Sequence, residues 1–165
     1  MPWRRRNTVA EIERRLAALG LSLPAPPQPI ALFLPFRRSG QLVFLAGQTC
    51  EQDGKVLYTG RVGLELDFET ARQAALLCAL NLLAALREAC DGRLERVARC
   101  VRVGGFVQAS AGYPRVPQVI DGASELFVGL FGERGKHART AVGVATLPQN
   151  AAVEVDAIFE LHEVP

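Results

Sequence analysis

The sequence lacks the features that mark membrane, secreted and nucleic acid-binding proteins. Its longest nearly apolar stretch, Ala71 to Leu86, is interrupted by polar residues and is shorter than the roughly 18 residues that a membrane-spanning helix needs. No apolar segment follows Met1 as it does in a signal peptide. The formal net charge is only +2, which gives nucleic acid binding no support. We therefore expect a cytoplasmic protein with neither membrane nor nucleic acid as a partner.

Motifs for metal binding and for the common catalytic classes are also absent. The four cysteines and two histidines form no CxxC pair and no set at the spacing of metal ligands. Signatures of serine hydrolases, zinc peptidases, P-loop proteins and dinucleotide-binding proteins are missing. We expect no metal site, and reduced thiols with Cys78 and Cys100 buried. Cys50 follows a strand and can be more exposed, but nothing near it in sequence lowers its thiol pKa.

What is present indicates an ordinary globular protein of 165 residues, with 49% hydrophobic and 22% charged residues. Near the N-terminus, Thr8 and Glu11 form a capping box, and apolar residues at helical spacing then predict a helix over residues 9–19. A proline-rich stretch predicts an extended linker after this helix. We divide the chain into an N-terminal helix and linker, residues 1–27, and an α+β domain, residues 28–165.

Turn signals between apolar runs predict the other elements. Asp53-Gly54 is typical of a hairpin turn, Asp67 can cap a helix, and Gly104-Gly105 indicates a bulge or a close backbone approach within a long strand. The predicted strands are Leu42–Ala46, Val56–Tyr58, Val97–Val107, Thr140–Ala145 and Ala152–Glu160, and the predicted helices are Phe68–Cys90 and Val119–Phe131. The first two strands, and likewise the last two, are expected to form pairs.

This order of elements predicts an α+β fold in which helices cover one face of a mixed sheet. The opposite face also needs a cover if its residues are apolar, and the N-terminal helix is the only spare element. We expect that helix to dock near the sheet edge or the helix layer and to contribute stability but no catalytic group. Self-association of the chain is then the expected cover for the apolar surface that is left.

One stretch carries a more specific pattern. In the segment from His137 to Pro148, Arg139 lies at the start of a predicted strand and a Leu-Pro turn ends the segment, and Glu154 follows fifteen residues after the arginine. In this pattern the chain resembles the Rid family (YjgF type), whose members are often labelled endoribonuclease L-PSP. Ala46-Gly47-Gln48 in the first strand is a further match. The resemblance covers about residues 28–161.

The resemblance implies a chorismate-mutase-like fold that assembles as a homotrimer, with three clefts between subunits. Well-studied members hydrolyse reactive 2-imino or enamino acids to 2-oxo acids and ammonia, without a metal or organic cofactor. The chain is therefore interpreted as an imine/enamine deaminase, a hydrolase of a small-molecule carboxylate. Its N-terminal helix resembles an addition in a longer subgroup of the family.

The resemblance also implies roles for single residues. Glu154 would be catalytic and orient the nucleophile towards the imine carbon, and Arg139 would hold the substrate carboxylate with its planar guanidinium. The other substrate-binding residues implied are Thr140, Ala141, Gly47, Phe33 and Ser124, and Asp121 can approach the same cleft. Spacing alone favours a plainer interpretation, in which Arg139 is a strand-end arginine paired with a surface carboxylate and Glu154 is an outward-facing strand residue.

Three departures from the family pattern bear on activity. Phe33 stands where the deaminases tend to have tyrosine, Ala46 where they have serine, and Ala141 where they have cysteine or threonine. The pocket is therefore expected to be more apolar, which favours a bulkier ligand or a site that binds without turnover. The alternative is a non-catalytic trimer that binds a small ligand or a partner. A different hydrolysis at the same cleft, including ribonuclease activity, is a third interpretation. The low charge and the scarcity of histidine disfavour RNA as the substrate.

Overall fold

Five strands form the central sheet of the computed structural model, which describes residues 9–29 and 32–163. Their order across the sheet is β1 (Phe36–Ser39), β2 (Leu42–Thr49), β7 (Val153–Leu161), β5 (Val97–Gln108) and β6 (Ala138–Val144). β6 runs parallel to β5, whereas the other neighbours are antiparallel, so the sheet is mixed as predicted. The expected pairing of the last two strands is wrong, because β5 lies between β6 and β7.

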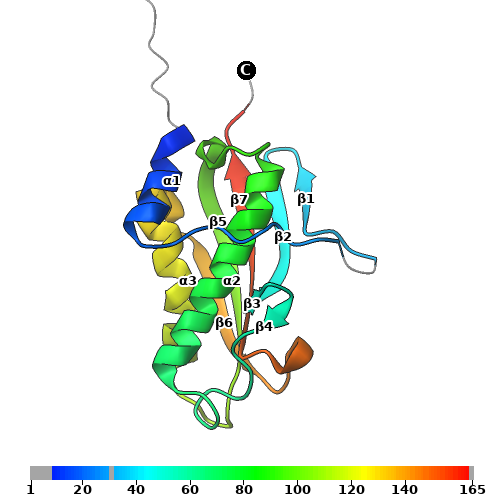
Figure 1. Cartoon of the computed structure of the whole chain (residues 1–165), viewed down its shortest axis with the longest axis vertical. Coiled ribbons are helices and arrows are strands. Elements are labelled where there is room, and N and C mark those ends of the chain that lie inside the picture. The colour runs from blue at the N-terminus through cyan, green and yellow to red at the C-terminus, as the bar shows by residue number, and fades with distance from the viewer. Residues whose placement is uncertain (1–8, 30–31, 164–165) are drawn as a thin grey trace, which may run out of the picture.

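Helices α2 (Phe68–Ala89) and α3 (Val116–Phe131) lie across the same face of the sheet (Figure 1). Asp67 caps α2 as predicted, since its carboxylate accepts the Thr70 N–H at 2.8 Å. Neither these helices nor any other described helix is long and apolar enough to cross a membrane. The predicted class, an α+β fold with helices on one face of a mixed sheet, is confirmed.

Helix α1 (Val9–Ala18) packs against α3 rather than against the open face of the sheet (Figure 1). Ile12 and Leu16 are buried, and Arg15 donates from Nη1 to a backbone carbonyl of α3 at 2.7 Å. The predicted docking of this helix on the helix layer is therefore confirmed. Thr8, the capping residue expected from the sequence, lies outside the described residues.

The face of the sheet opposite α2 and α3, which we call the outer face, has no covering element among the described residues. Every second residue of the strands points to it, and this set includes Phe44, Arg102, Phe106, Val142, Glu154, Asp156 and Ile158. Phe44 and Val142 are 43% and 40% exposed. Apolar residues on an uncovered face support self-association, and the homotrimer stays a prediction.

The hairpin near residue 53 differs from the prediction. Asp53 and Gly54 form its turn with positive φ, but the strands on either side are β3 (Glu51–Gln52) and β4 (Lys55–Val56), which make a separate two-stranded sheet. β2 instead pairs with β7 and with β1, a strand that the sequence pattern does not predict. β1 is a short edge strand with three exposed polar residues, so it lacks the apolar alternation by which strands are found.

Strand β5 passes through Gly104 and Gly105 without a bulge, and its register shifts lie in the first half of the strand. Both glycines are places of close approach. A Cβ on Gly105 would overlap Ile120 of α3, and one on Gly104 would overlap the carboxylate of Asp156. The predicted bulge is therefore wrong, and the close backbone approach is confirmed.

All four cysteines are buried and free. Cys50 is as buried as the others, because Asn81 of α2 holds the backbone beside it by donating to the carbonyls of Thr49 at 3.1 Å and Glu51 at 2.8 Å. A hydrogen bond from Cys78 lowers the pKa of the Cys50 thiol to about 6. The expected exposure of Cys50 is thus wrong. The main cause of its lowered pKa is Cys78 on α2, which is distant in sequence and so gives no local signal.

Candidate functional site

Arg139 lies near the start of β6 and points to the helix side of the sheet. It stands opposite Val103, a buried residue of β5, and residues opposite each other on paired strands share a face. Its guanidinium donates from Nη1 to Asp121 Oδ1 at 2.7 Å and to Ser124 Oγ at 3.1 Å, and from Nη2 to the Pro117 carbonyl at 3.2 Å. Within the described residues, Nε and one hydrogen of Nη2 have no partner, and we call these the free donors of Arg139.

Helix α3 supplies both side chains that bind Arg139. Asp121 and Ser124 are three residues apart, which places them on the same helix face. The side chains of the Arg139–Asp121 ion pair are 23% and 40% exposed, so the pair is partly shielded from water. This geometry agrees with the plainer interpretation of Arg139 as an arginine paired with a carboxylate, and it leaves donors for a ligand as well.

Ser124 also contacts His137, the residue two positions before Arg139. Ser124 Oγ lies 2.9 Å from His137 Nε2, and His137 Nδ1 lies 2.7 Å from the Gly135 carbonyl oxygen. The Phe127 ring meets the imidazole edge-on at 6.2 Å. Burial, opposed by the bond to Gly135 and reinforced by the charge of Arg139, lowers the pKa of His137. The imidazole is therefore neutral near pH 7.

Glu154 projects from β7 onto the outer face, beside Gly47. The register of β2 against β7 shifts between Leu45 and Gln48, and a Cβ on Gly47 would overlap the Glu154 carboxylate. Burial, and then the nearby charge of Asp156, raise the pKa of Glu154. A side chain at position 47 would therefore shift the Glu154 carboxylate from the place it occupies here.

Within one chain, Arg139 and Glu154 do not meet. Arg139 is on the helix side of β6, Glu154 is on the outer face of β7, and β5 separates the two strands. The residue of β6 in register with Glu154, through Phe106 of β5, is Val142. A cleft that holds both side chains therefore needs more than one copy of the chain.

The other predicted site residues divide between these two places. Ala141 points to the helix side, as Arg139 does, whereas Thr140 points outwards and is exposed. Phe33 is 55% exposed, and its segment runs beside β2, where Pro35 O accepts the N–H of Ala46 at 2.9 Å. Phe33 is thus near the Gly47 end of β2.

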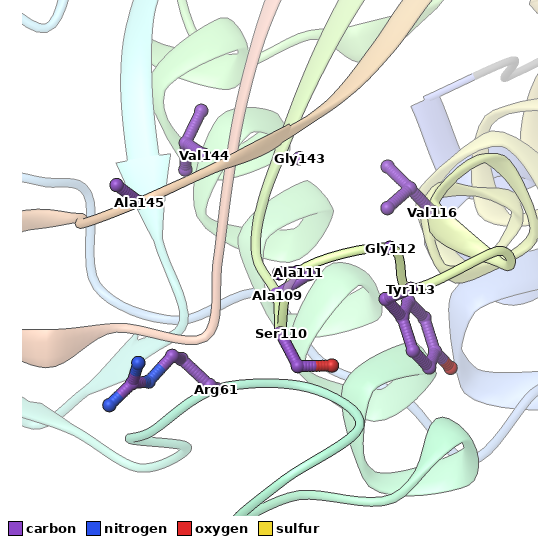
Figure 2. A pocket seen from close by; sticks show the side chains of 10 residues that line it. All are labelled: Arg61, Ala109, Ser110, Ala111, Gly112, Tyr113, Val116, Gly143, Val144 and Ala145. Carbon is purple, nitrogen blue, oxygen red and sulfur yellow. The ribbon is translucent and has the colours of Figure 1, made fainter.

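A hollow of about 490 Å³ lies at the other end of β6, away from Arg139. It is lined by Arg61, Ala109, Ser110, Ala111, Gly112, Tyr113, Val116, Gly143, Val144 and Ala145. Figure 2 shows Arg61 and Tyr113 on opposite sides of Ser110. None of the predicted site residues lines this hollow, and sequence reasoning gave no role to Arg61 or Tyr113.

The described residues contain no group of three or more His, Cys, Asp or Glu side chains that could hold a metal ion.

The main site feature that sequence reasoning missed is the pair of Ser124 and His137. The signal was available: His137 and Arg139 are two residues apart at the start of a strand, and residues at that spacing share a face. His137 was given no role because its partner lies on a different element.

Comparison with known proteins agrees with this architecture. The model of the YjgF/chorismate mutase-like endoribonuclease family matches residues 13–161. Protein TCP17 of Trypanosoma cruzi is 39% identical over 152 residues, which are 92% of this chain and 94% of that protein. A 2-iminobutanoate/2-iminopropanoate deaminase of Dermatophagoides farinae is 30% identical over 142 residues, which are 86% of this chain and 95% of that protein.

A solved structure extends the comparison to three dimensions. The crystal structure of Atu1372 from Agrobacterium tumefaciens, a protein of unknown function, superposes with a TM-score of 0.87 at 42% identity, over 93% of this chain and 94% of that chain. The family pattern and the fold thus coincide over nearly the whole length. The chain belongs to the YjgF/chorismate mutase-like endoribonuclease family, whose members include the Rid proteins.

Proposed function

We propose that the protein is a hydrolytic deaminase of reactive 2-imino or enamino acids, which releases 2-oxo acids and ammonia in a cleft between subunits of a homotrimer. The observation that carries the proposal is the state of Arg139, held on one side by α3 and left with free donors on the other. A deaminase of this kind among the relatives supports the same chemistry. A cytoplasmic location is part of the proposal, in keeping with four cysteines that form no disulfide.

The role of Arg139 is to bind the carboxylate common to these substrates. A guanidinium forms charge-assisted hydrogen bonds to carboxylate oxygens, and its contacts with α3 limit the orientations that it can adopt. The substrate is then bound in one orientation, because its carboxylate is fixed on Arg139 and the position of its imine carbon is fixed with it. Such positioning lowers the barrier without any nucleophilic side chain.

In this proposal Glu154 is the general base that activates the attacking water molecule. Water adds to the imine carbon, the nitrogen takes up protons, and the carbon–nitrogen bond breaks to give ammonia and the 2-oxo acid. A carboxyl group whose pKa is raised takes and returns a proton nearer to neutral pH than an ordinary one does. Glu154 would accept a proton from the attacking water and return it to the leaving nitrogen.

The separation of Arg139 and Glu154 supports a cleft between subunits. Because Arg139 and Glu154 lie on different faces of one sheet, we assign them in each cleft to neighbouring subunits. The outer face, with Phe44 and Val142 exposed, offers the apolar area that such an assembly buries. The apolar Phe33, Ala46 and Ala141 then favour substrates with a bulkier or less polar side chain.

A non-catalytic ligand-binding or partner-binding trimer is the second candidate, and one observation favours it. Asp121 already neutralises much of the charge of Arg139, which weakens the attraction for a second carboxylate. Such a site would bind 2-oxo acids weakly and release no ammonia.

The test is ammonia release from a panel of imino acids, generated in place by a pyridoxal-phosphate enzyme and graded in side-chain size. We expect the wild-type protein to accelerate release, with a preference for apolar side chains, and Arg139→Ala to be inactive. Arg87→Ala is a matched control, because Arg87 is an exposed arginine of α2 paired with Glu13, away from the outer face. No acceleration for any substrate, with 2-oxo acids still bound, would favour the non-catalytic candidate.

A further inference from the structure

A line of hydrogen bonds connects Arg139 through Ser124 and His137 to the Gly135 carbonyl. Arg139 Nη1 donates to Ser124 Oγ at 3.1 Å, and Ser124 Oγ lies 2.9 Å from His137 Nε2. His137 Nδ1 lies 2.7 Å from the Gly135 carbonyl oxygen. A carbonyl oxygen can only accept, so Nδ1 must carry a hydrogen, and Nε2 of a neutral imidazole must then accept from the Ser124 hydroxyl. Each bond thus sets the direction of the next.

Ser124 uses its hydroxyl in an unusual way for a residue inside a helix. A helical serine commonly donates to the backbone carbonyl one turn before it. The bonds of Ser124 within the described residues go instead to two side chains, Arg139 of β6 and His137 just before that strand. His137 is held in turn by the Gly135 carbonyl and by the edge-on contact with Phe127. The orientation of the serine hydroxyl therefore depends on His137.

We propose that His137 and Ser124 are positioning residues for Arg139: neutral His137 keeps the Ser124 hydroxyl oxygen as an acceptor for the guanidinium, and this directs the free donors of Arg139 towards the substrate carboxylate. The inference rests on the proposed function, since it gives Arg139 a carboxylate ligand. Neither residue touches the substrate in this arrangement. Both act through Arg139.

Burial first, and then the charge of Arg139, lower the pKa of His137 and keep its imidazole neutral. Arg139 is the charged group that acts on it from its own strand, and burial acts in the same direction. Other charged groups on nearby elements have partners of their own, and Arg134 of the short helix before His137 donates to the Val97 carbonyl at 2.8 Å. On α3, Asp121 binds Arg139, and on the short helix before His137, Lys136 binds Glu133 at 2.8 Å. On β5, Arg102 pairs with Asp156 on the outer face.

Protonation would disturb this line of bonds. A protonated Nε2 would donate to Ser124 Oγ, which already accepts from Arg139, and the serine hydrogen would need a new acceptor. Two positive groups would then meet on one oxygen atom. The neutral form with the hydrogen on Nδ1 is therefore the form that positions Arg139.

The first measurement is the tautomer of His137 in the ligand-free protein, from long-range nitrogen–proton NMR spectra of the imidazole. The chain has two histidines, so a His162→Gln background leaves His137 as the single signal. We expect the Nδ1–H tautomer, with an Nε2 resonance that moves when Ser124 is replaced by alanine. An Nε2–H tautomer would overturn the inference.

The second measurement is calorimetric titration of pyruvate and 2-oxobutyrate into wild type and four variants. Ser124→Ala and His137→Leu each break the line of bonds and should weaken binding about fivefold, the effect of losing one ordinary hydrogen bond. Ser124→Thr keeps the hydroxyl, and His137→Gln keeps an acceptor at that end, so both should bind within about twofold of wild type. Recovery by these conservative variants is not expected of residues that serve packing alone.

The outcomes separate the inference from the proposed function. Equal affinity of all five proteins would overturn the positioning role and leave the deaminase proposal intact. If wild type does not bind 2-oxo acids although the Nδ1–H tautomer is present, the claim that Arg139 binds a carboxylate is wrong, whereas the hydrogen bond between His137 and Ser124 stands. If His137→Leu does not fold, Ser124→Ala and its threonine counterpart still decide the matter.

Discussion

The side chains of Arg139 and Glu154 lie on opposite faces of one sheet, and β5 separates their strands. If the proposed cleft takes one residue from each of two neighbouring subunits, defects in the two residues can complement each other. Arg139→Ala and Glu154→Gln chains, each inactive alone, should regain about one quarter of wild-type ammonia release when co-expressed in equal amounts, because half of the arginines and half of the glutamates are intact. A mixture as inactive as its parents would contradict a cleft that combines Arg139 of one subunit with Glu154 of its neighbour.

The outer face should hold the trimer together. Val142→Asp puts a charge among exposed apolar residues of that face, so it should shift the protein from trimer to monomer at micromolar concentration in sedimentation. Leu64→Asp is the control, because Leu64 is 67% exposed and lies outside the sheet. Wild-type protein that sediments as a monomer would contradict both the assembly and the cleft between subunits.

Arg139 should dominate ligand affinity. Its replacement by alanine removes a charge-assisted pair worth about 1.5 to 3 kcal/mol, so affinity for 2-oxo acids should fall at least about tenfold. Arg139→Lys keeps the charge but loses the planar group, in which Nη1 binds Asp121 and Ser124 while Nε and Nη2 keep donors for a ligand, so it should also impair binding. Calorimetry with Arg87→Ala as the control measures both effects. Unchanged affinity in Arg139→Ala would remove the carboxylate site.

Glu154 should make stability depend on pH. Burial raises its pKa above the ordinary 4.5, so the folded state binds a proton more readily than the unfolded state, and stability from this group falls as pH rises between the two pKa values. Glu154→Gln should therefore raise the free energy of unfolding at pH 7.5 and have little effect at pH 3.5. Urea unfolding at both values measures this, with Glu133→Gln, 85% exposed, as the control. A variant less stable than wild type at pH 7.5 would contradict the argument.

Helix α1 should contribute stability and no specificity. Ile12 is 3% exposed, and truncating such a side chain to alanine costs about 2 kcal/mol or more. Leu19→Ala, at a position 54% exposed, should cost far less. Deletion of residues 1–20 should lower the melting temperature and leave the order of preference among 2-oxo acids unchanged, which thermal unfolding and calorimetry can check. An altered order would assign this helix a part in the site.

Sequence patterns predicted well those elements that are determined by residues close together in the sequence. The cap at Asp67 and the alternation of β7 depend on neighbouring residues, so they are visible in the sequence. β1 was missed because three of its four residues are exposed and polar. At Gly104-Gly105 the sequence left a bulge and a close approach open, and it could not decide between them because Asp156 and Ile120, which approach the glycines, lie on other elements.

The candidate site shows the same limit. Asp121 and Ser124 were linked to Arg139 in advance only through the family resemblance, and their contact with it depends on how α3 packs on β6. The position of Glu154 relative to Arg139 depends on strand order, which spacing along the chain does not contain. The pair of His137 and Ser124 joins two elements and has no signature within either.

Gln108, at the end of β5, fixes the turn that precedes β7 and Glu154. This buried side chain accepts the Leu147 N–H at 2.9 Å and donates to Asn150 Oδ1 at 2.7 Å, and it thereby holds a turn whose residues Gln149 and Asn150 have positive φ. The turn leads directly into β7 and Glu154. Its conformational entropy is therefore lost when the chain folds, and a ligand that meets Glu154 does not have to order this part of the backbone.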